Sequence, residues 1–226
     1  MQAQDTSELF LFKLWPWIET NKNRIFIGAG VVVAATFIFS FVGWERGQRE
    51  IAAGNALTQL TISVQPDTTP SQLAGMYLRV AGDHPGTIAG QRAQLQAAAT
   101  LFTAGDFSGA QTQFQKFLDA YPDSSFSASA TLGLAASLDA QGKTDPAVTA
   151  YQQVINNFSE AAAVMGAKFA LARIDEQQGK LNEALNYYED VTRAGANGSS
   201  LAMEAGIHMV EIKNKLAAAK PAVVKP

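Results

Sequence analysis

The chain contains no cysteine, only two histidines and few charged residues. The lack of cysteine excludes disulfides, thiolate zinc sites, iron–sulfur clusters and cysteine nucleophiles. With 17 basic and 20 acidic residues the net charge is −3, so the chain lacks the basic excess typical of a nucleic-acid-binding protein. Charged residues make up 16% and hydrophobic residues 47% of the 226 residues, a balance that excludes disorder over the whole chain.

Catalytic motifs are also missing from the sequence. It contains no Gly-x-Ser-x-Gly elbow, no phosphate-binding loop and no His-Glu-x-x-His. His84 stands before Pro85 and is expected in a loop. His208 has Glu204 and Glu211 about one helical turn away, which predicts a pair on a helix surface. We therefore expect no enzymatic activity, no catalytic residue, no cofactor and no metal site.

One segment has the length and composition of a membrane span. Residues 25–44 carry no charge and are bounded by Arg24 and Glu45. As an α-helix at 1.5 Å per residue they cover about 30 Å, the thickness of the hydrocarbon core of a bilayer. A cleaved signal peptide has a shorter apolar core and a small-x-small exit, whereas this segment ends in Trp44 before charged residues. The pattern favours a retained transmembrane helix over a signal peptide or a buried core helix.

The tail before the span, residues 1–24, contains an apolar cluster between Leu9 and Ile18 that is too short to cross a membrane. It is either an interfacial or docking segment or a passive lead-in to the span. Basic residues flank the span, three before it and two after it: Lys13, Lys22, Arg24, Arg46 and Arg49. This small bias predicts a cytoplasmic N-terminus.

Beyond the span, the sequence repeats with a period of 37 residues. The repeated positions are a glycine (Gly105, Gly142, Gly179), an alanine (Ala110, Ala147, Ala184), an aromatic residue (Phe114, Tyr151, Tyr188) and an apolar residue (Phe117, Val154, Val191). A glycine ends a helix readily because it adopts a left-handed conformation, and an alanine lets two helices approach closely. Each unit is therefore predicted to be a helical hairpin that completes its core by stacking on its neighbours.

The fold class is thus expected to be all-α: a transmembrane helix followed by an α-solenoid. The repeat domain is expected over residues 45–216. We place its hairpins at about 45–82, 87–120, 125–157 and 161–193, followed by a capping helix at 200–216 and a flexible tail at 217–226.

The repeated residues resemble the tetratricopeptide repeat family. The best match is the first complete unit, with Gly105-Asp106-Phe107, Ala110, Phe114 and the closing pair Tyr121-Pro122. The next two units lack the closing proline, and the standard unit of this family has 34 residues rather than 37. The resemblance covers residues 46–216 and implies a fold of stacked hairpins.

A short tail, one span and a tetratricopeptide domain together resemble the membrane-anchored ancillary subunit of the bacterial Sec translocon. That resemblance implies a single-pass protein of the inner membrane with a periplasmic repeat domain. Its partners would be translocon subunits, periplasmic chaperones or client chains. The repeat type also resembles the periplasmic cell-division coordinator of the Tol-Pal system, which is normally secreted rather than anchored.

The resemblance also implies that the first helices of the hairpins line a concave, protein-binding face. The candidates for this lining are Arg92, Leu95, Ala99, Leu132, Ala136, Asp139, Phe169, Arg173 and Glu176. Arg92 and Arg173 can receive carboxylates of a partner. In the alternative interpretation the charged members are a solvated face and the apolar members belong to the core. A second functional hypothesis is a structural spacer or envelope coordinator, in which the span and the tail do the binding.

Overall fold

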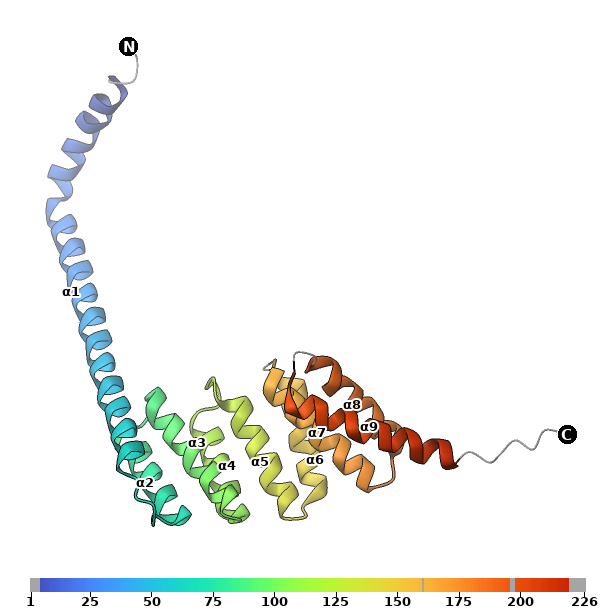
Figure 1. The fold of residues 1–226 in the computed structure, drawn as a ribbon. Helices are drawn as coiled ribbons and strands as arrows, with labels where there is room; N and C mark the ends of the chain where they lie inside the picture. Colours follow the sequence, from blue (N-terminus) through green and yellow to red (C-terminus); the bar gives the residue numbers. More distant parts are fainter. Residues whose placement is uncertain (1–4, 160, 196–197, 220–226) are drawn as a thin grey trace. The chain divides into compact units, whose positions relative to one another are not determined.

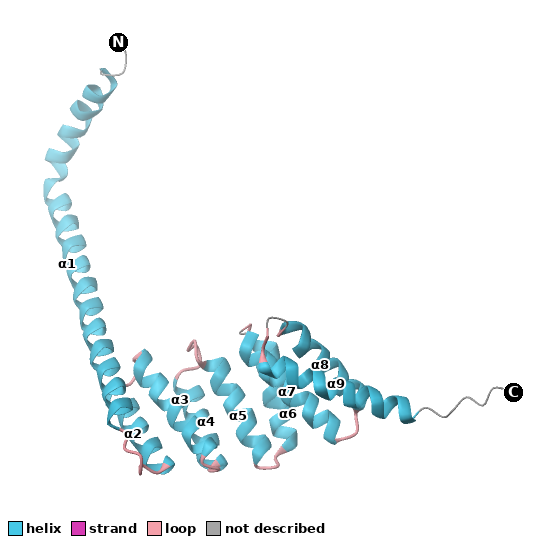
Figure 2. Ribbon diagram, in the orientation of Figure 1, coloured by secondary structure: helices cyan, strands magenta, loops and turns pink. Residues whose placement is uncertain are grey.

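The computed structural model describes residues 5–159, 161–195 and 198–219, and this part of the chain is helical with no strand (Figures 1 and 2). The helices are α1 (Asp5–Ser63), α2 (Pro70–Asp83), α3 (Ile88–Thr103), α4 (Phe107–Ala120), α5 (Ser127–Ala140), α6 (Thr144–Asn157), α7 (Ala161–Gln177), α8 (Leu181–Ala194) and α9 (Ser200–Ala219). The expected all-α class is confirmed. The chain divides into two compact units between Ala52 and Ala53.

The first unit is the long N-terminal part of α1. It is long and apolar enough to cross a membrane, and the side chains of its apolar stretch are exposed, Phe39 by 84%. Side chains of the apolar cluster expected between Leu9 and Ile18 lie outside the described part of the chain. The same holds for residues 220–226 of the expected C-terminal tail; its first residues extend α9 to Ala219.

The second unit begins where α1 first buries a side chain. Residues 45–52 bury none, whereas Ala53 is fully buried, and Leu60 packs with Val80 of α2 and Ala93 of α3. The helix α2 starts at Pro70 because Thr69 caps it. The Thr69 hydroxyl accepts a hydrogen bond from the backbone N–H of Gln72, and the Gln72 side chain accepts one from the backbone N–H of Thr69.

The turn inside each later hairpin recurs with the 37-residue period. Gly105, Gly142 and Gly179 adopt left-handed φ values of 82°, 72° and 76°. The backbone N–H of the residue after each glycine donates to a carbonyl five residues earlier, at 2.9, 3.0 and 2.8 Å: Asp106 to Leu101, Lys143 to Leu138 and Lys180 to Asp175. These bonds satisfy the free carbonyls at the end of each first helix, as in a Schellman cap. The glycine role expected from the sequence is confirmed.

The predicted contact residues occupy the core. Ala110, Ala147 and Ala184 are fully buried, and the aromatic residue four positions after each of them is also buried. Four hydrophobic clusters follow along the stack, and each draws buried residues from the two helices of one hairpin and from the first helix of the next. A hairpin therefore shares its core with its successor, and α9 supplies the shared face for the last hairpin.

Two layers of helices result from this stacking, and in Figure 1 α2 to α9 follow one another in chain order. The first helices touch one another in turn: α3 contacts α5, α5 contacts α7, and α7 contacts α9. Among the described residues, the second helices α4, α6 and α8 make no such contacts with one another. In a curved stack, the layer whose helices are closer together lies on the inside. The first helices α3, α5 and α7 are closer together than the second helices, so they form the inner layer.

Tight packing between neighbouring hairpins depends on a glycine of α5. A Cβ atom on Gly133 would overlap the ring of Phe114, which reaches across from α4. Gly75 in α2 is also helical, but a Cβ atom there would meet no atom within 4 Å.

We predict opposite effects of Gly→Ala at these two positions. Gly75→Ala should raise the free energy of unfolding by about 0.5–1 kcal/mol, because alanine restricts the unfolded chain. Gly133→Ala should lower it by about 1–3 kcal/mol, because the new methyl group displaces Phe114. Urea unfolding of the detergent-solubilised protein, followed by circular dichroism, measures both. Stabilisation by Gly133→Ala would contradict the packing of α4 on α5.

Candidate protein-binding groove

The inner layer of helices carries a hollow of about 650 Å³. It extends from the ends of α3 and α5 to α7, and residues of α4 and α6 contribute to its wall. The lining residues are Phe102, Thr103, Phe107, Ala136, Asp139, Ala140, Tyr151, Phe169, Ala170, Arg173 and Gln177. We call this hollow the groove.

Four of the residues predicted from the sequence lie together in the groove: Ala136, Asp139, Phe169 and Arg173. The other five do not line it, and the structure places each of them elsewhere. Arg92 is exposed, with its guanidinium 5.9 Å from the ring centroid of Phe126, and Ala99 is exposed on α3. Leu95 and Leu132 are half-buried against core clusters, in agreement with the alternative interpretation for the apolar members.

The charged residues of the groove are paired with each other. Nη2 of Arg173 lies 3.2 Å from Oδ2 of Asp139, so the ion pair joins α7 to α5. The Arg173 side chain is half-exposed and that of Asp139 is mostly buried. A partner carboxylate can reach the guanidinium, which has five donors, without removing Asp139 from it.

Tyr151 of α6 supplies a phenol to the groove. Burial and the neighbouring Asp139 raise the pKa of Tyr151 above its usual value, and Arg173 opposes this only in part. The phenol therefore stays protonated at neutral pH. Together with the rings of Phe102 and Phe107, whose centroids are 5.2 Å apart, it forms an aromatic wall beside the cation. Such a surface suits an apolar or aromatic side chain next to an acidic group.

Sequence reasoning missed the part of the groove that comes from outside the first helices. Tyr151 was expected only as a core residue, and Phe107 only as part of the turn. For Phe107 the sequence did contain a signal. This residue follows the Gly105 turn directly, so it begins α4 next to the end of α3, where the groove starts.

Glu176 lies outside the groove and joins α7 to the cap. Its carboxylate accepts hydrogen bonds from Nζ of Lys215 at 3.2 Å and from the phenol of Tyr188 at 3.2 Å. Nδ1 of His208 lies 3.0 Å from the same carboxylate, and the imidazole stacks on the Tyr188 ring at a centroid distance of 5.0 Å. The expected pairing of His208 within its own helix is wrong, since its partner stands 32 residues earlier on α7.

These contacts change the acidity of Glu176. Burial disfavours the charged carboxylate, but the hydrogen bond from Lys215, the neighbouring His208 and the hydrogen bond from Tyr188 outweigh this cost. They hold the pKa of Glu176 below its usual value. Among the described residues, Glu176, His208 and Glu211 offer ligand atoms within 4.8 Å of one another. A metal ion there would have to displace the Lys215 ammonium, so we assign Glu176 and His208 to the docking of α9.

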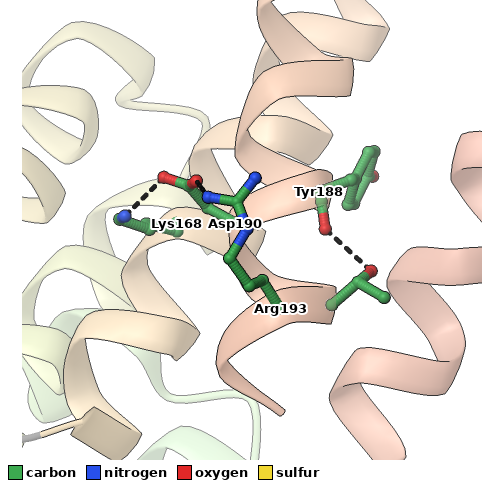
Figure 3. Close-up of polar contacts among 5 residues, drawn as sticks. Lys168, Tyr188, Asp190 and Arg193 are labelled. Atoms are coloured by element: carbon green, nitrogen blue, oxygen red, sulfur yellow. Dashed lines mark hydrogen bonds and ion pairs between the residues drawn. The ribbon is translucent and has the colours of Figure 1, made fainter. Parts of the chain in front are cut away.

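Another ion pair ties α8 to α7, and a second one lies next to it within α8. Asp190 of α8 lies between Lys168 of α7, at 2.5 Å, and Arg193 of its own helix, at 3.4 Å (Figure 3). Partly exposed pairs of this kind contribute about 0–1 kcal/mol each, so they add little to the stability of the fold.

Stacked hairpins with small residues at the contacts and a groove on the inner layer define an α-solenoid, a class of fold whose extended inner surfaces are suited to binding. The comparison with protein families agrees with this class. The family described as tetratricopeptide repeat-like domain matches residues 16–154, and the chain belongs to this family. No curated protein matches the chain.

We predict that Glu176→Gln weakens the attachment of the cap. At pH 7 it should lower the free energy of unfolding by about 1–3 kcal/mol, because charge-assisted hydrogen bonds are lost. A carboxyl whose pKa is lowered in the folded state stabilises above its unfolded-state pKa and loses this effect as the pH falls through the folded value. The difference between wild type and variant should therefore shrink below about pH 4.

Urea unfolding at pH 7 and pH 3 measures this difference. Glu183→Gln, at an exposed position of α8, serves as the control and should change the free energy of unfolding by less than about 0.5 kcal/mol. An equal loss in Glu176→Gln at both pH values would show that its charge does not hold α9.

Proposed function

We propose that this chain is a non-enzymatic, membrane-anchored scaffold that binds segments of other proteins in the groove. The observation that carries the proposal is the combination of an aromatic wall, a neutral phenol and a half-exposed guanidinium on the inner layer of a tetratricopeptide-type stack. An extended polypeptide segment offers matching groups, since it presents apolar side chains and carboxylates at short intervals.

The finer proposal is an ancillary subunit of the bacterial Sec translocon that passes emerging chains to periplasmic chaperones. Its support is the order of parts: a short tail, one apolar helix and a repeat domain. The family match begins at residue 16, upstream of the apolar segment, so this segment belongs to the region that the family shares. A retained helix of this kind keeps the repeats at a membrane, where a translocation partner would be found.

The proposed location is the inner membrane, with the N-terminus in the cytoplasm and the repeats in the periplasm. The basis is the charge bias around residues 25–44, three basic residues before the segment and two after it. The long repeat domain has little weight in this rule, because large domains cross the membrane largely regardless of charge.

We predict that protease added to spheroplasts digests the chain beyond Gly47 and spares a small membrane-held N-terminal fragment. The reason is that the repeat domain would then face the added protease. Antibodies against tags at the two ends of the chain distinguish the fragments on a gel. A fully protected repeat domain would place it in the cytoplasm and remove the translocation role.

The groove itself is tested by filling it. Ala140 lines the groove and is exposed, so Ala140→Trp should block a bound segment without entering the core. Ala120→Trp, at an exposed position at the end of α4, is the matched control. Crosslinking in native membranes should attach translocon subunits, chaperones or client chains to wild type and to the control. Ala140→Trp should reduce their yield by at least about tenfold.

Two outcomes would contradict this proposal. Equal yields from Ala140→Trp and wild type would mean that the groove does not bind, in agreement with a spacer whose span and tail do the binding. Crosslinks that never include a translocation or chaperone protein would remove the finer proposal and leave the scaffold.

A further inference from the structure

The outer face of α9 carries a row of exposed apolar side chains. Met203, Ile207 and Val210 stand at helical spacing and are 64%, 62% and 59% exposed. Terminal helices of repeat stacks usually turn a polar face to the solvent. Lys213 and Lys215, two of the charged residues of α9, instead pair with Glu189 and Glu176 in the preceding hairpin. We call the three exposed residues the α9 stripe.

Comparison of α9 with α7 shows which face of a first helix carries the α9 stripe. In α7, three residues pack toward α5 and α6: Ala167, Leu171 and Ile174. Their equivalents 38 residues later pack toward α7 and α8: Ala205, Met209 and Ile212. The two helices thus bury the same face against the preceding hairpin.

The same offset maps the α9 stripe onto the residues with which α7 holds its own second helix. These residues are Met165, Phe169 and Ala172, which pack against α8. Their equivalents are Met203, Ile207 and Val210, and within the described residues no helix covers them. The α9 stripe is therefore the place of a second helix in an incomplete hairpin.

The surroundings of the α9 stripe specify the charge of its occupant. Glu204 and Glu211 line one edge; both are exposed, and neither forms an ion pair or hydrogen bond with another residue of the described chain. On the other edge stands Gly206, where a Cβ atom would meet nothing within 4 Å, so a helix can approach closely. The site thus favours an apolar helix with basic residues along the edge that faces the two glutamates.

A second copy of α9 fits this site poorly. Second helices in this fold run antiparallel to their first helices, and two identical helices packed antiparallel bring equal edges together. Glu204 of one copy would then face Glu211 of the other, and like charges repel. Anionic lipid headgroups are disfavoured for the same reason.

We propose that the α9 stripe binds an amphipathic helix of another protein, which completes the fifth hairpin and meets Glu204 and Glu211 with lysine or arginine. The binding follows the helix-in-groove mode, with apolar anchors at i, i+4 and i+7. This surface is separate from the groove, so the chain can hold a partner at α9 while the groove binds another segment.

A photoreactive amino acid at Ile207 of the full chain, irradiated in native membranes, tests this proposal. We expect a crosslink whose attachment site, located by mass spectrometry, lies on an amphipathic helix of another protein with basic residues on one edge. The same label at exposed Gln153 of α6 is the control and should not reach that helix. A crosslink to a second copy, to lipid or to an acidic or non-helical segment would overturn the proposal, as would the absence of a crosslink.

Charge reversal supplies the second measurement. Glu204→Lys combined with Glu211→Lys should reduce the crosslink by at least about tenfold, since it places like charges at the contact. Both side chains are exposed, so folding is expected to survive, and circular dichroism checks this. Glutamate in place of the basic residues of the partner should restore the yield, and failure to restore it would overturn the proposal. Ala140→Trp should leave this crosslink unchanged, which separates the α9 stripe from the groove.

Discussion

The structure depends on close contacts between the two helices of each hairpin, at positions that are occupied by alanine. At Ala110, Ala147 and Ala184 the side chain is fully buried between the helices, and a buried aromatic residue follows four positions later. Alanine keeps the helices near each other, so each hairpin is thin and holds little core of its own. The hairpin therefore completes its core with the first helix of the next unit, and the repeat domain grows by stacking.

Stacking of this kind also produces the surfaces that can bind. In the part of the chain that the structure describes, the first helices touch one another while the second helices do not, and residues of α3, α5 and α7 line the groove. The same stacking leaves α9, which is the last of the first helices, with one face buried on the preceding hairpin and the opposite face exposed. The groove and the α9 stripe are thus two consequences of one repeating contact.

The repeating elements could be predicted from the sequence because they are local. Gly105 and its equivalents mark the turns, and the alanines mark the contacts, since both roles depend on the backbone within one hairpin. The groove could be predicted only in part. Asp139 and Arg173 follow from the position of the first helices, whereas Tyr151 enters the groove through the way in which neighbouring hairpins overlap.

The contacts of the capping helix α9 could be predicted from the sequence even less completely than those of the groove. The offset from α7 to α9 is 38 residues rather than 37, and one residue turns a helix by about 100°. The extra residue shifts the register of α9 by one position, so that His208 takes the place of Ala170 in α7 and reaches Glu176, while α9 still buries the same face as α7. The 37-residue pattern does not indicate this shift, because the extra residue lies before α9.

The most direct test of the alanine contact is the stability of Ala147→Trp against Gln152→Trp, in urea unfolding of the full protein. Gln152 is exposed on the same helix, so its substitution adds the same ring without entering the contact. We predict that Ala147→Trp lowers the free energy of unfolding by at least about 1–3 kcal/mol, as overpacking does. The control should change it by less than about 0.5 kcal/mol. Equal stability of the two variants would show that α5 and α6 do not meet at Ala147, and the stacking derived from that contact would be wrong.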